Sequence, residues 1–347
     1  MKLPMPGVVR RLIRSLQWQG RRTPDPILNS GIVYRGGDLL EAIHGSLPEW
    51  LLLLAALVTR LGDVWVVISI TIVGSWLVTW HRQRDERTRA LTSPTPSEAR
   101  ESRAEPAVWI VAALVGGLAA MTALKYAFAL PRPEQVVATP GLLSGALESA
   151  YVSSVTLGGY GFPSGHAVGA TVAYGLLALV VPFGSRRQRF AVAGAVALSV
   201  SLSRVLLTVH YPGDVVAGVA LGVAYLAGVW WLLERSPLDR TTTAFGLALG
   251  LAVVAIAVSG AGGRSVTYAA LAAGGLVVWT LGQRQLSPSP SSSGRSSYHA
   301  ESATVALGLV AALVALESDP AAVAPAAVLG GLVVAPAVWA GRETRST

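Results

Sequence analysis

Three short polar blocks lie at the edges of long apolar stretches and carry the side chains of this chain that are best suited to chemistry. They are 125–133 (KYAFALPRP), 163–166 (PSGH) and 203–214 (SRVLLTVHYPGD). Together they supply three cations, two histidines and an acid. An ionisable side chain inside or at the edge of a membrane segment costs free energy, so each of these groups is a candidate functional residue.

The cations predict an anion-binding site. Lys125, Arg132 and Arg204 can together hold a multiply charged anion, and planar guanidinium groups bind phosphate oxygens in a bidentate way. Ser164 and Gly165 open an expected helix, whose unpaired N–H groups and positive dipole end favour an anion. Phosphate is therefore the natural ligand, and these groups would balance its charge without a metal or another cofactor.

The histidines predict covalent phosphoryl transfer. Pro212 and Gly213 interrupt the helix after His210, which allows the carboxylate of Asp214 to turn back onto the imidazole. That pairing would fix the tautomer and stabilise the imidazolium, leaving one ring nitrogen free to attack phosphorus. His166 would then protonate the leaving oxygen and later activate water.

Each block taken alone has a simpler structural interpretation. Arg132 before a proline can merely end a helix with a snorkelling cation. Pro-Ser-Gly is an ordinary helix start, and Asp214 can serve only as an N-cap. His210 can be an interfacial histidine with its polar end in water. Independent accidents do not account for the order of these groups at one membrane face, so we favour the joint functional interpretation.

The three blocks together resemble the signature of the type 2 phosphatidic acid phosphatase superfamily, which reads K-x6-R-P, then P-S-G-H, then S-R-x5-H-x3-D. The resemblance covers roughly residues 47–235 and rests on about ten positions in three blocks. In that family the second-block histidine is the general acid, the third-block histidine becomes a phosphohistidine, and the acid orients it. The resemblance implies catalytic roles for His166, His210 and Asp214, and phosphate binding by Lys125, Arg132, Ser164, Gly165 and Arg204.

The composition independently indicates an integral membrane protein. Of the 347 residues, 52% are hydrophobic and 13% are charged, and the mean hydropathy is +0.54. The absence of cysteine excludes disulfides, thiolate nucleophiles and cysteine metal sites. The formal net charge is +8, but the cations form no basic patch interleaved with aromatic residues, so nucleic acid is not an expected partner. Anionic lipid headgroups are the simpler partner, and the oligomeric state stays open.

Apolar runs long enough to cross about 30 Å of hydrocarbon predict an all-α, polytopic membrane helix bundle. Five core helices are expected at 63–80, 107–130, 166–184, 190–210 and 214–233, and four additional ones at 242–260, 265–281, 302–317 and 322–340. The apolar run at 47–61 is short for a span. It predicts either a tilted helix or one that lies in the outer half of the bilayer.

We expect three regions along the chain. These are a basic N-terminal segment at 1–46, a lipid phosphatase core at 47–235, and accessory transmembrane helices at 236–347 with a Ser/Pro-rich linker at 286–297. The start of the chain lacks the apolar run and cleavage site of a signal peptide, and fits a surface helix on anionic lipid or a solvated tail. The accessory helices are expected to serve packing or oligomerisation, with partner binding or lateral substrate access as the alternative.

Basic residues predict the orientation in the cell membrane. The loop between the helices at 63–80 and 107–130 contains six arginines, and more follow in the next two loops on the same side, which the positive-inside rule makes cytoplasmic. The segment 134–162, on the opposite side, contains no Lys or Arg and is either a lid or a plain connector. All three blocks adjoin that opposite side, so the predicted active site faces away from the cytoplasm.

These observations predict an integral membrane phosphohydrolase that cleaves a lipid phosphate monoester or diphosphate through a phosphohistidine, without metal. Phosphatidate, phosphatidylglycerophosphate and polyprenyl diphosphates are candidate substrates. A lipid phosphotransferase, in which an alcohol replaces water, is the alternative; vanadate-dependent haloperoxidases share the anion site but are typically soluble. A non-enzymatic lipid-binding protein would need the cations but not the pair of His210 and Asp214.

Overall fold

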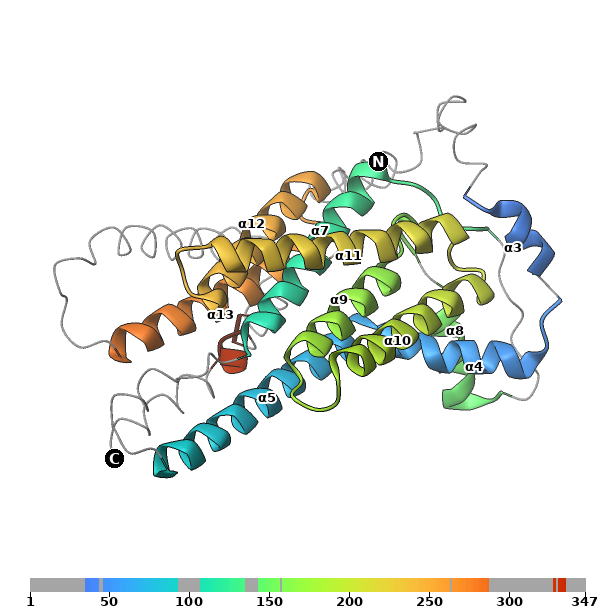
Figure 1. Cartoon of the computed structure of the whole chain (residues 1–347). Helices are drawn as coiled ribbons and strands as arrows, with labels where there is room; N and C mark the ends of the chain where they lie inside the picture. The colour runs from blue at the N-terminus through green and yellow to red at the C-terminus, as the bar shows by residue number, and fades with distance from the viewer. Residues whose placement is uncertain are drawn as a thin grey trace, which may run out of the picture.

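The regular structure of the described residues is entirely helical, which confirms the predicted all-α class (Figure 1). The computed structural model describes residues 35–43, 46–92, 107–134, 143–156, 158–262, 264–286, 327–328 and 330–334. Several sequence predictions lie outside these ranges: the start of the N-terminal segment, the linker after Leu286, the helix at 302–317 and most of the helix at 322–340. Of that last helix, residues 327–328 and 330–334 are described and are helical.

Within the described residues, six helices are long and apolar enough to cross a membrane. They are α5 (Val64–Thr92), α7 (Trp109–Phe128), α10 (Arg186–Leu206), α11 (Pro212–Arg235), α12 (Arg240–Ser259) and α13 (Ser265–Leu286). Each corresponds to one of the predicted spans. The chain is therefore a multi-pass membrane protein, as its apolar runs predicted.

Helix α9 (Gly165–Val180) lies in the middle of the bundle, where it contacts α5, α7, α10 and α11. At 16 residues it is shorter than the stretch of about 20 that usually crosses a bilayer. Most of its side chains are buried because neighbouring helices, rather than lipid, surround it. Its first turn therefore begins inside the protein, and Ser164 at the N-cap is 0% exposed.

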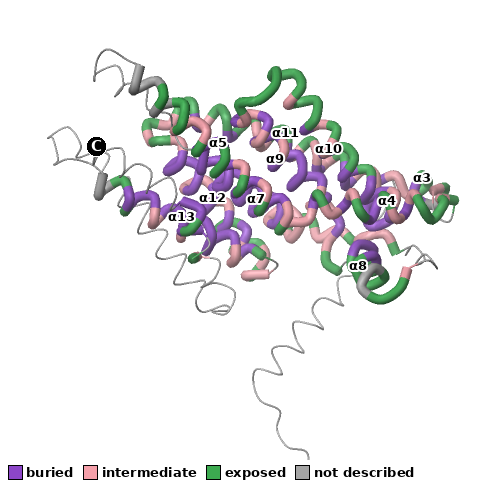
Figure 2. Tube along the Cα trace, turned by 90° about the horizontal axis from the view of Figure 1, so that it is seen from below, coloured by how far each residue is buried: buried purple, intermediate pink, exposed green. Residues whose placement is uncertain are grey.

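Helix α7 is buried over most of its length, from Trp109 to Thr122 with the exception of Ala120, and becomes more exposed toward its end (Figure 2). Its glycines permit close packing: a Cβ at Gly116 would lie 2.4 Å from the hydroxyl of Tyr225 and 3.2 Å from Cα of Ala248. Tyr225 of α11 also donates a hydrogen bond to the carbonyl of Ala113 at 2.7 Å. Thus α12 packs tightly on α7, α11 reaches it through Tyr225, and the accessory helices α12 and α13 share one apolar core with it.

Short helices gather at the end of the bundle where α9 begins (Figure 1). They are α3 (Gly37–Ile43), α4 (Glu49–Thr59) with a 3-10 turn at Arg60–Gly62, and α8 (Gly145–Val155). An 11-residue helix such as α4 is about 16 Å long, which is half the hydrocarbon thickness, so the apolar run at 47–61 does not form a span. The predicted loop at 134–162 contains α8, which contacts α4.

The connection between α10 and α11 corrects the helix predicted at 190–210. Helix α10 ends at Leu206, and Thr208 adopts a left-handed conformation with φ of 51°. Pro212 begins α11 and disfavours helical geometry at Tyr211 before it. His210 consequently lies in a tight turn between two helices rather than on a helix, and the turn sets the direction of its ring.

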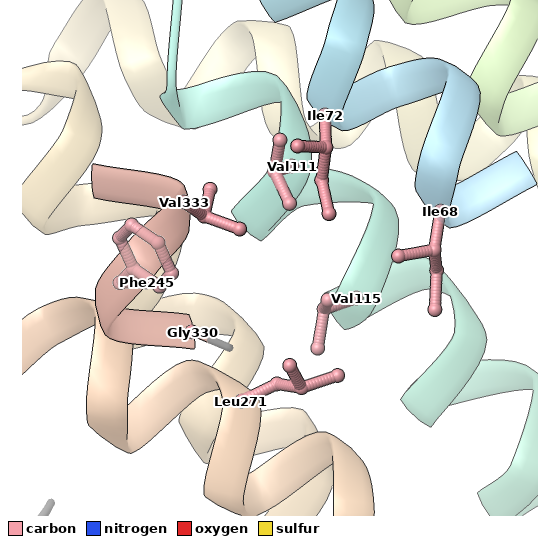
Figure 3. A pocket seen from close by; sticks show the side chains of 8 residues that line it. All are labelled: Ile68, Ile72, Val111, Val115, Phe245, Leu271, Gly330 and Val333. Atoms are coloured by element: carbon pink, nitrogen blue, oxygen red, sulfur yellow. The ribbon is translucent and has the colours of Figure 1, made fainter. Parts of the chain in front are cut away.

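An apolar pocket lies between the core helices and the accessory helices (Figure 3). Ile68 of α5, Val115 of α7, Phe245 of α12 and Leu271 of α13 are among its lining residues, and Val333 closes it from the short helical segment at 330–334. All of its lining residues are apolar or glycine. The pocket is therefore a packing feature of the bundle and contains none of the ionisable side chains that the sequence singled out.

Candidate active site

The directions of the helices bring the three blocks to one end of the bundle. Helix α7 finishes in the first block, α9 begins in the second, and α10 and α11 meet in the third. Two backbone hydrogen bonds hold this region together. Ser164 N–H of the second block donates to the carbonyl of Asp214 in the third at 2.9 Å, and Gly161 N–H, just before the second block, donates to the carbonyl of Leu130 in the first at 2.8 Å. The residues predicted to bind phosphate and to transfer it therefore share one region of space.

His210 is buried between Arg132 and Asp214. Its Nε2 lies 2.9 Å from Nη1 of Arg132, and its Nδ1 lies 3.5 Å from Oδ2 of Asp214. A guanidinium can only donate, so Nε2 must carry the lone pair and the ring proton sits on Nδ1, facing the carboxylate. The separation of 3.5 Å from Asp214 is longer than an ordinary hydrogen bond. The imidazole thus presents Nε2 as its basic, nucleophilic nitrogen.

Arg204 is 1% exposed, and only part of its guanidinium group is hydrogen-bonded to the protein. Its Nη1 donates to the hydroxyl of Thr59 in α4. Its Nε and Nη2, and the hydroxyl of Ser164, have no hydrogen-bond partner among the described residues. A buried donor without a partner costs about 1–3 kcal/mol, and more when it is charged. These groups therefore indicate a polar ligand, and the charge of Arg204 suits an anion.

Lys125 and Arg132 bind backbone carbonyls at the rim of the same region. Lys125 Nζ donates to the carbonyl of Tyr160 at 2.9 Å, and Arg132 Nη1 donates to the carbonyl of Val209 at 3.0 Å. Gly165, in the first turn of α9, lies against the lysine: a Cβ at this glycine would lie 3.6 Å from Cε of Lys125. The start of α9 thus lies against Lys125 at this rim.

His166 has a carboxylate partner that the sequence analysis missed. Its Nε2 lies 3.0 Å from Oδ1 of Asp63, and Arg60 donates to Oδ2 of the same carboxylate at 3.2 Å. Both residues precede α5, outside the three blocks. The signal that could have found Asp63 is its position at the first residue of the apolar helix predicted at 63–80, where an acid is costly.

Asp214 also has a partner that the sequence analysis missed. Arg35 Nη1 lies 2.8 Å from Oδ1 of Asp214, and its Nη2 donates to the carbonyl of Pro131 at 3.1 Å. The carbonyl of Arg35 accepts a hydrogen bond from Gly213 N–H at 2.9 Å. Arg35 belongs to the segment expected to lie apart from the core, and no spacing pattern connects it to the blocks.

Burial and charge shape the protonation of the site. Burial lowers the pKa of His210 well below its ordinary value, and the positive charges of Arg132, Arg204 and Lys125, followed by His166, lower it further. Burial also lowers the pKa of Arg132, against the opposing charge of Asp214. Burial raises the pKa of Asp63, but the hydrogen bonds from His166 and Arg60 outweigh it and leave this pKa below its ordinary value. The site therefore keeps His210 neutral and Asp63 ionised.

Comparisons with known proteins agree with this geometry. Residues 106–237 match the PAP2 superfamily. The chain is also similar to phosphatidylglycerophosphatase B of Bacillus subtilis (strain 168), with 37% identity over 70 residues, which cover 18% of this chain and 34% of that relative. The match thus spans about a third of the relative's length, and no solved structure matches the chain. All three blocks fall inside the matched range, and residues 106–237 of this protein are a PAP2 superfamily domain.

Proposed function

We propose that this protein is an integral membrane phosphohydrolase that cleaves a lipid phosphate monoester or diphosphate through a phosphohistidine on His210. One observation carries the proposal: Nε2 of His210 bears a lone pair beside Arg132 and near the positive charge of Arg204, whose Nε and Nη2 have no hydrogen-bond partner among the described residues. A phosphoryl group against Nε2 would accept hydrogen bonds from these donors. The PAP2 domain and the phosphatase activity for which the Bacillus relative is named support the same chemistry.

The first step forms the phosphohistidine. Arg132, which donates to Nε2 in the free protein, must exchange this nitrogen for a phosphate oxygen before attack. Nε2 of His210 then forms a bond to phosphorus while the bond from phosphorus to the leaving oxygen breaks, and His166 donates a proton to that oxygen. Asp214 faces Nδ1 and stabilises the positive charge on the phosphorylated ring.

The second step regenerates the enzyme. His166, now neutral, removes a proton from water, whose oxygen attacks phosphorus as the bond to Nε2 breaks. Lys125, Arg132 and Arg204, with the hydroxyl of Ser164 and the backbone at Gly165, hold the phosphoryl oxygens in both steps. These groups balance the developing charge, and we propose that the reaction needs no metal.

The substrate would be a phosphorylated lipid whose tail stays in the bilayer. The site lies at one end of a membrane bundle, so a headgroup can enter it while the acyl or polyprenyl chain remains among apolar helices. The named activity of the Bacillus relative makes phosphatidylglycerophosphate the first candidate, ahead of phosphatidate and polyprenyl diphosphates.

We place the active site on the extracytoplasmic side of the cell membrane. Support comes from the opposite end of the bundle, where arginines stack on aromatic rings, as expected for the cytoplasmic interface. Each guanidinium carbon lies 4.7 to 5.7 Å from the ring centroid of its partner: Arg84 over Trp80, Arg186 over Phe190, Arg235 over Trp231 and Arg240 over Trp230. The positive-inside rule would then direct the phosphate site outward.

We propose residues 47–235 as the phosphatase core and the later helices as accessory. The close approach of Gly116 to Ala248, together with the shared apolar core, supports a packing role for α12 and α13. The basic segment 1–46 would be mainly peripheral, except that Arg35 reaches the site.

Phosphate release from purified full-length protein tests the proposed function. Phosphatidylglycerophosphate, phosphatidate and a polyprenyl diphosphate are compared in detergent, with His210→Ala as the catalytic variant and exposed Glu234→Gln as the control. We expect the wild type and the control to release phosphate from at least one lipid, and His210→Ala to lose activity by at least about 10⁴-fold. Equal release by His210→Ala and the wild type would overturn the assignment of the nucleophile.

A further inference from the structure

The two histidines of the site are held through opposite ring nitrogens. His210 faces Asp214 through Nδ1 and presents Nε2 to the cations. His166 faces Asp63 through Nε2, at 3.0 Å, and its Nδ1 has no hydrogen-bond partner among the described residues. Each imidazole therefore has one nitrogen backed by a carboxylate and one left for other groups.

Gly62 determines which edge of the His166 ring meets Asp63. A Cβ at Gly62 would lie 2.9 Å from Cδ2 and 3.3 Å from Cβ of His166, so the glycine allows the ring to lie against the turn that precedes α5. Cδ2 and Nε2 share an edge of the imidazole. This edge faces Gly62 and Asp63, and the opposite edge, with Nδ1, faces away from them.

The carboxylate of Asp63 is itself held on both oxygens. Oδ1 meets His166, and Oδ2 accepts a hydrogen bond from Arg60 at 3.2 Å. Arg60 also donates to the carbonyl of Ala150 and, at 2.7 Å, to the hydroxyl of Ser153, both in α8. Asp63 is thus fixed between the start of α9 and helix α8, which lies beside α4 (Figure 1).

The surroundings of His166 disfavour its protonated form, which a neighbouring carboxylate can stabilise. Burial lowers the pKa of His166, and the positive charges of Arg204 and, less strongly, Arg132 lower it further, whereas the hydrogen bond and charge of Asp63 raise it. A general acid must carry a proton before it can donate one. Asp63, whose own pKa lies below its ordinary value, is the carboxylate in contact with the ring that offsets these cations.

We infer that Asp63 is the positioning residue of His166: its carboxylate accepts a hydrogen bond from Nε2–H, stabilises the imidazolium, and leaves Nδ1–H to protonate the leaving oxygen. After that transfer, Nδ1 carries the lone pair that removes a proton from water, while Nε2–H remains hydrogen-bonded to Asp63. This inference rests on the proposed function. It extends the site beyond residues 106–237, because Asp63 lies outside the matched range.

The dependence of the rate on the leaving group tests this role. The rate constant kcat/KM is measured for a lipid alkyl phosphate, whose alkoxide needs protonation, and for p-nitrophenyl phosphate, whose leaving group does not. We use the ratio of kcat/KM for the alkyl ester to kcat/KM for the nitrophenyl ester. Within one variant this ratio is independent of the fraction of protein that is folded. Full-length wild type, Asp63→Asn, His166→Ala, His210→Ala and the exposed control Glu234→Gln are compared.

We expect Asp63→Asn to lower kcat/KM for the alkyl ester by about 10- to 100-fold and for the nitrophenyl ester by less than about threefold. His166→Ala should show the same selectivity with a larger loss, and Glu234→Gln should match the wild type. If the ratio falls in His166→Ala but not in Asp63→Asn, Asp63 has only a structural role and the inference is wrong. If His210→Ala hydrolyses both esters like the wild type, the proposed function itself fails, and the inference fails with it.

Discussion

Arg35 and Asp214, which are 179 positions apart in the sequence, form a buried ion pair with 2.8 Å between Nη1 and Oδ1. The second oxygen of Asp214 accepts a hydrogen bond from Tyr211 N–H at 3.1 Å and faces Nδ1 of His210. The guanidinium of Arg35 also lies over the Tyr211 ring, 4.4 Å from its centroid. The carboxylate that faces the proposed nucleophile is therefore held in place from outside the PAP2 domain.

Replacing Arg35 by Gln should weaken both stability and activity. Removing one partner of a buried ion pair leaves an uncompensated charge and costs about 3–5 kcal/mol. We expect a lower thermal unfolding temperature in detergent and a fall in kcat/KM of at least about tenfold, since Asp214 loses its orientation. Arg187→Gln, at an exposed arginine of the opposite end, is the control. If Arg35→Gln matches this control in both measurements, the ion pair has no role in the site.

The pH profile should reflect the neutral state of His210. The nucleophile acts as the free imidazole, and its pKa lies well below the ordinary value of about 6.5. Protonation, and with it the loss of kcat/KM, should therefore begin only below pH of about 6.5.

Arg132→Gln provides the matched comparison for this profile. The variant removes a positive charge that lowers the pKa of His210, so that pKa should rise and the acid limb should move to higher pH. Titration of the substrate phosphate is common to both proteins and cancels in the comparison. An acid limb that stays in place, or moves to lower pH, would contradict the electrostatic coupling between these two residues.

Activity should survive chelation and be inhibited by vanadate. Cations of the protein balance the phosphate charge in the proposed reaction, so EDTA should leave kcat unchanged. Vanadate adopts the trigonal bipyramidal geometry of the transferring phosphoryl group and should compete with substrate. Arg204→Lys keeps the positive charge but loses the planar guanidinium that can bind two oxygens at once, and it should raise the vanadate inhibition constant by about tenfold. Arg235→Lys is the control, and activity that EDTA removes and a metal restores would refute the proposal.

The sidedness can be measured by cysteine labelling, because the chain has no native cysteine. Glu148 is exposed in α8 at the end that contains the site, and Arg187 is exposed at the opposite end. A membrane-impermeant maleimide should label Glu148→Cys in intact cells, and Arg187→Cys only after permeabilisation. The reverse pattern would place the site on the cytoplasmic side.

The positions of the membrane helices and the chemistry of the three blocks could be predicted from the sequence. Both are local signals: a span needs an apolar run of a given length, and the blocks depend on spacings of at most twelve residues. The end of α10 was mispredicted because the apolar run continues through Leu207 and Val209, whereas Thr208 and Pro212 turn the chain. The helix α8 was also missed, since its sequence has no strong apolar periodicity.

Only the tertiary structure decided which distant residues meet the blocks. Arg35, Thr59 and Asp63 are single residues at the ends of short helices and turns, and a lone charge or hydroxyl there has no spacing that links it to a site. Their contacts arise when α3, α4 and the turn before α5 pack against α9, α10 and α11. A sequence determines its local elements through short-range patterns, but the partners of Asp214, Arg204 and His166 depend on how those elements pack.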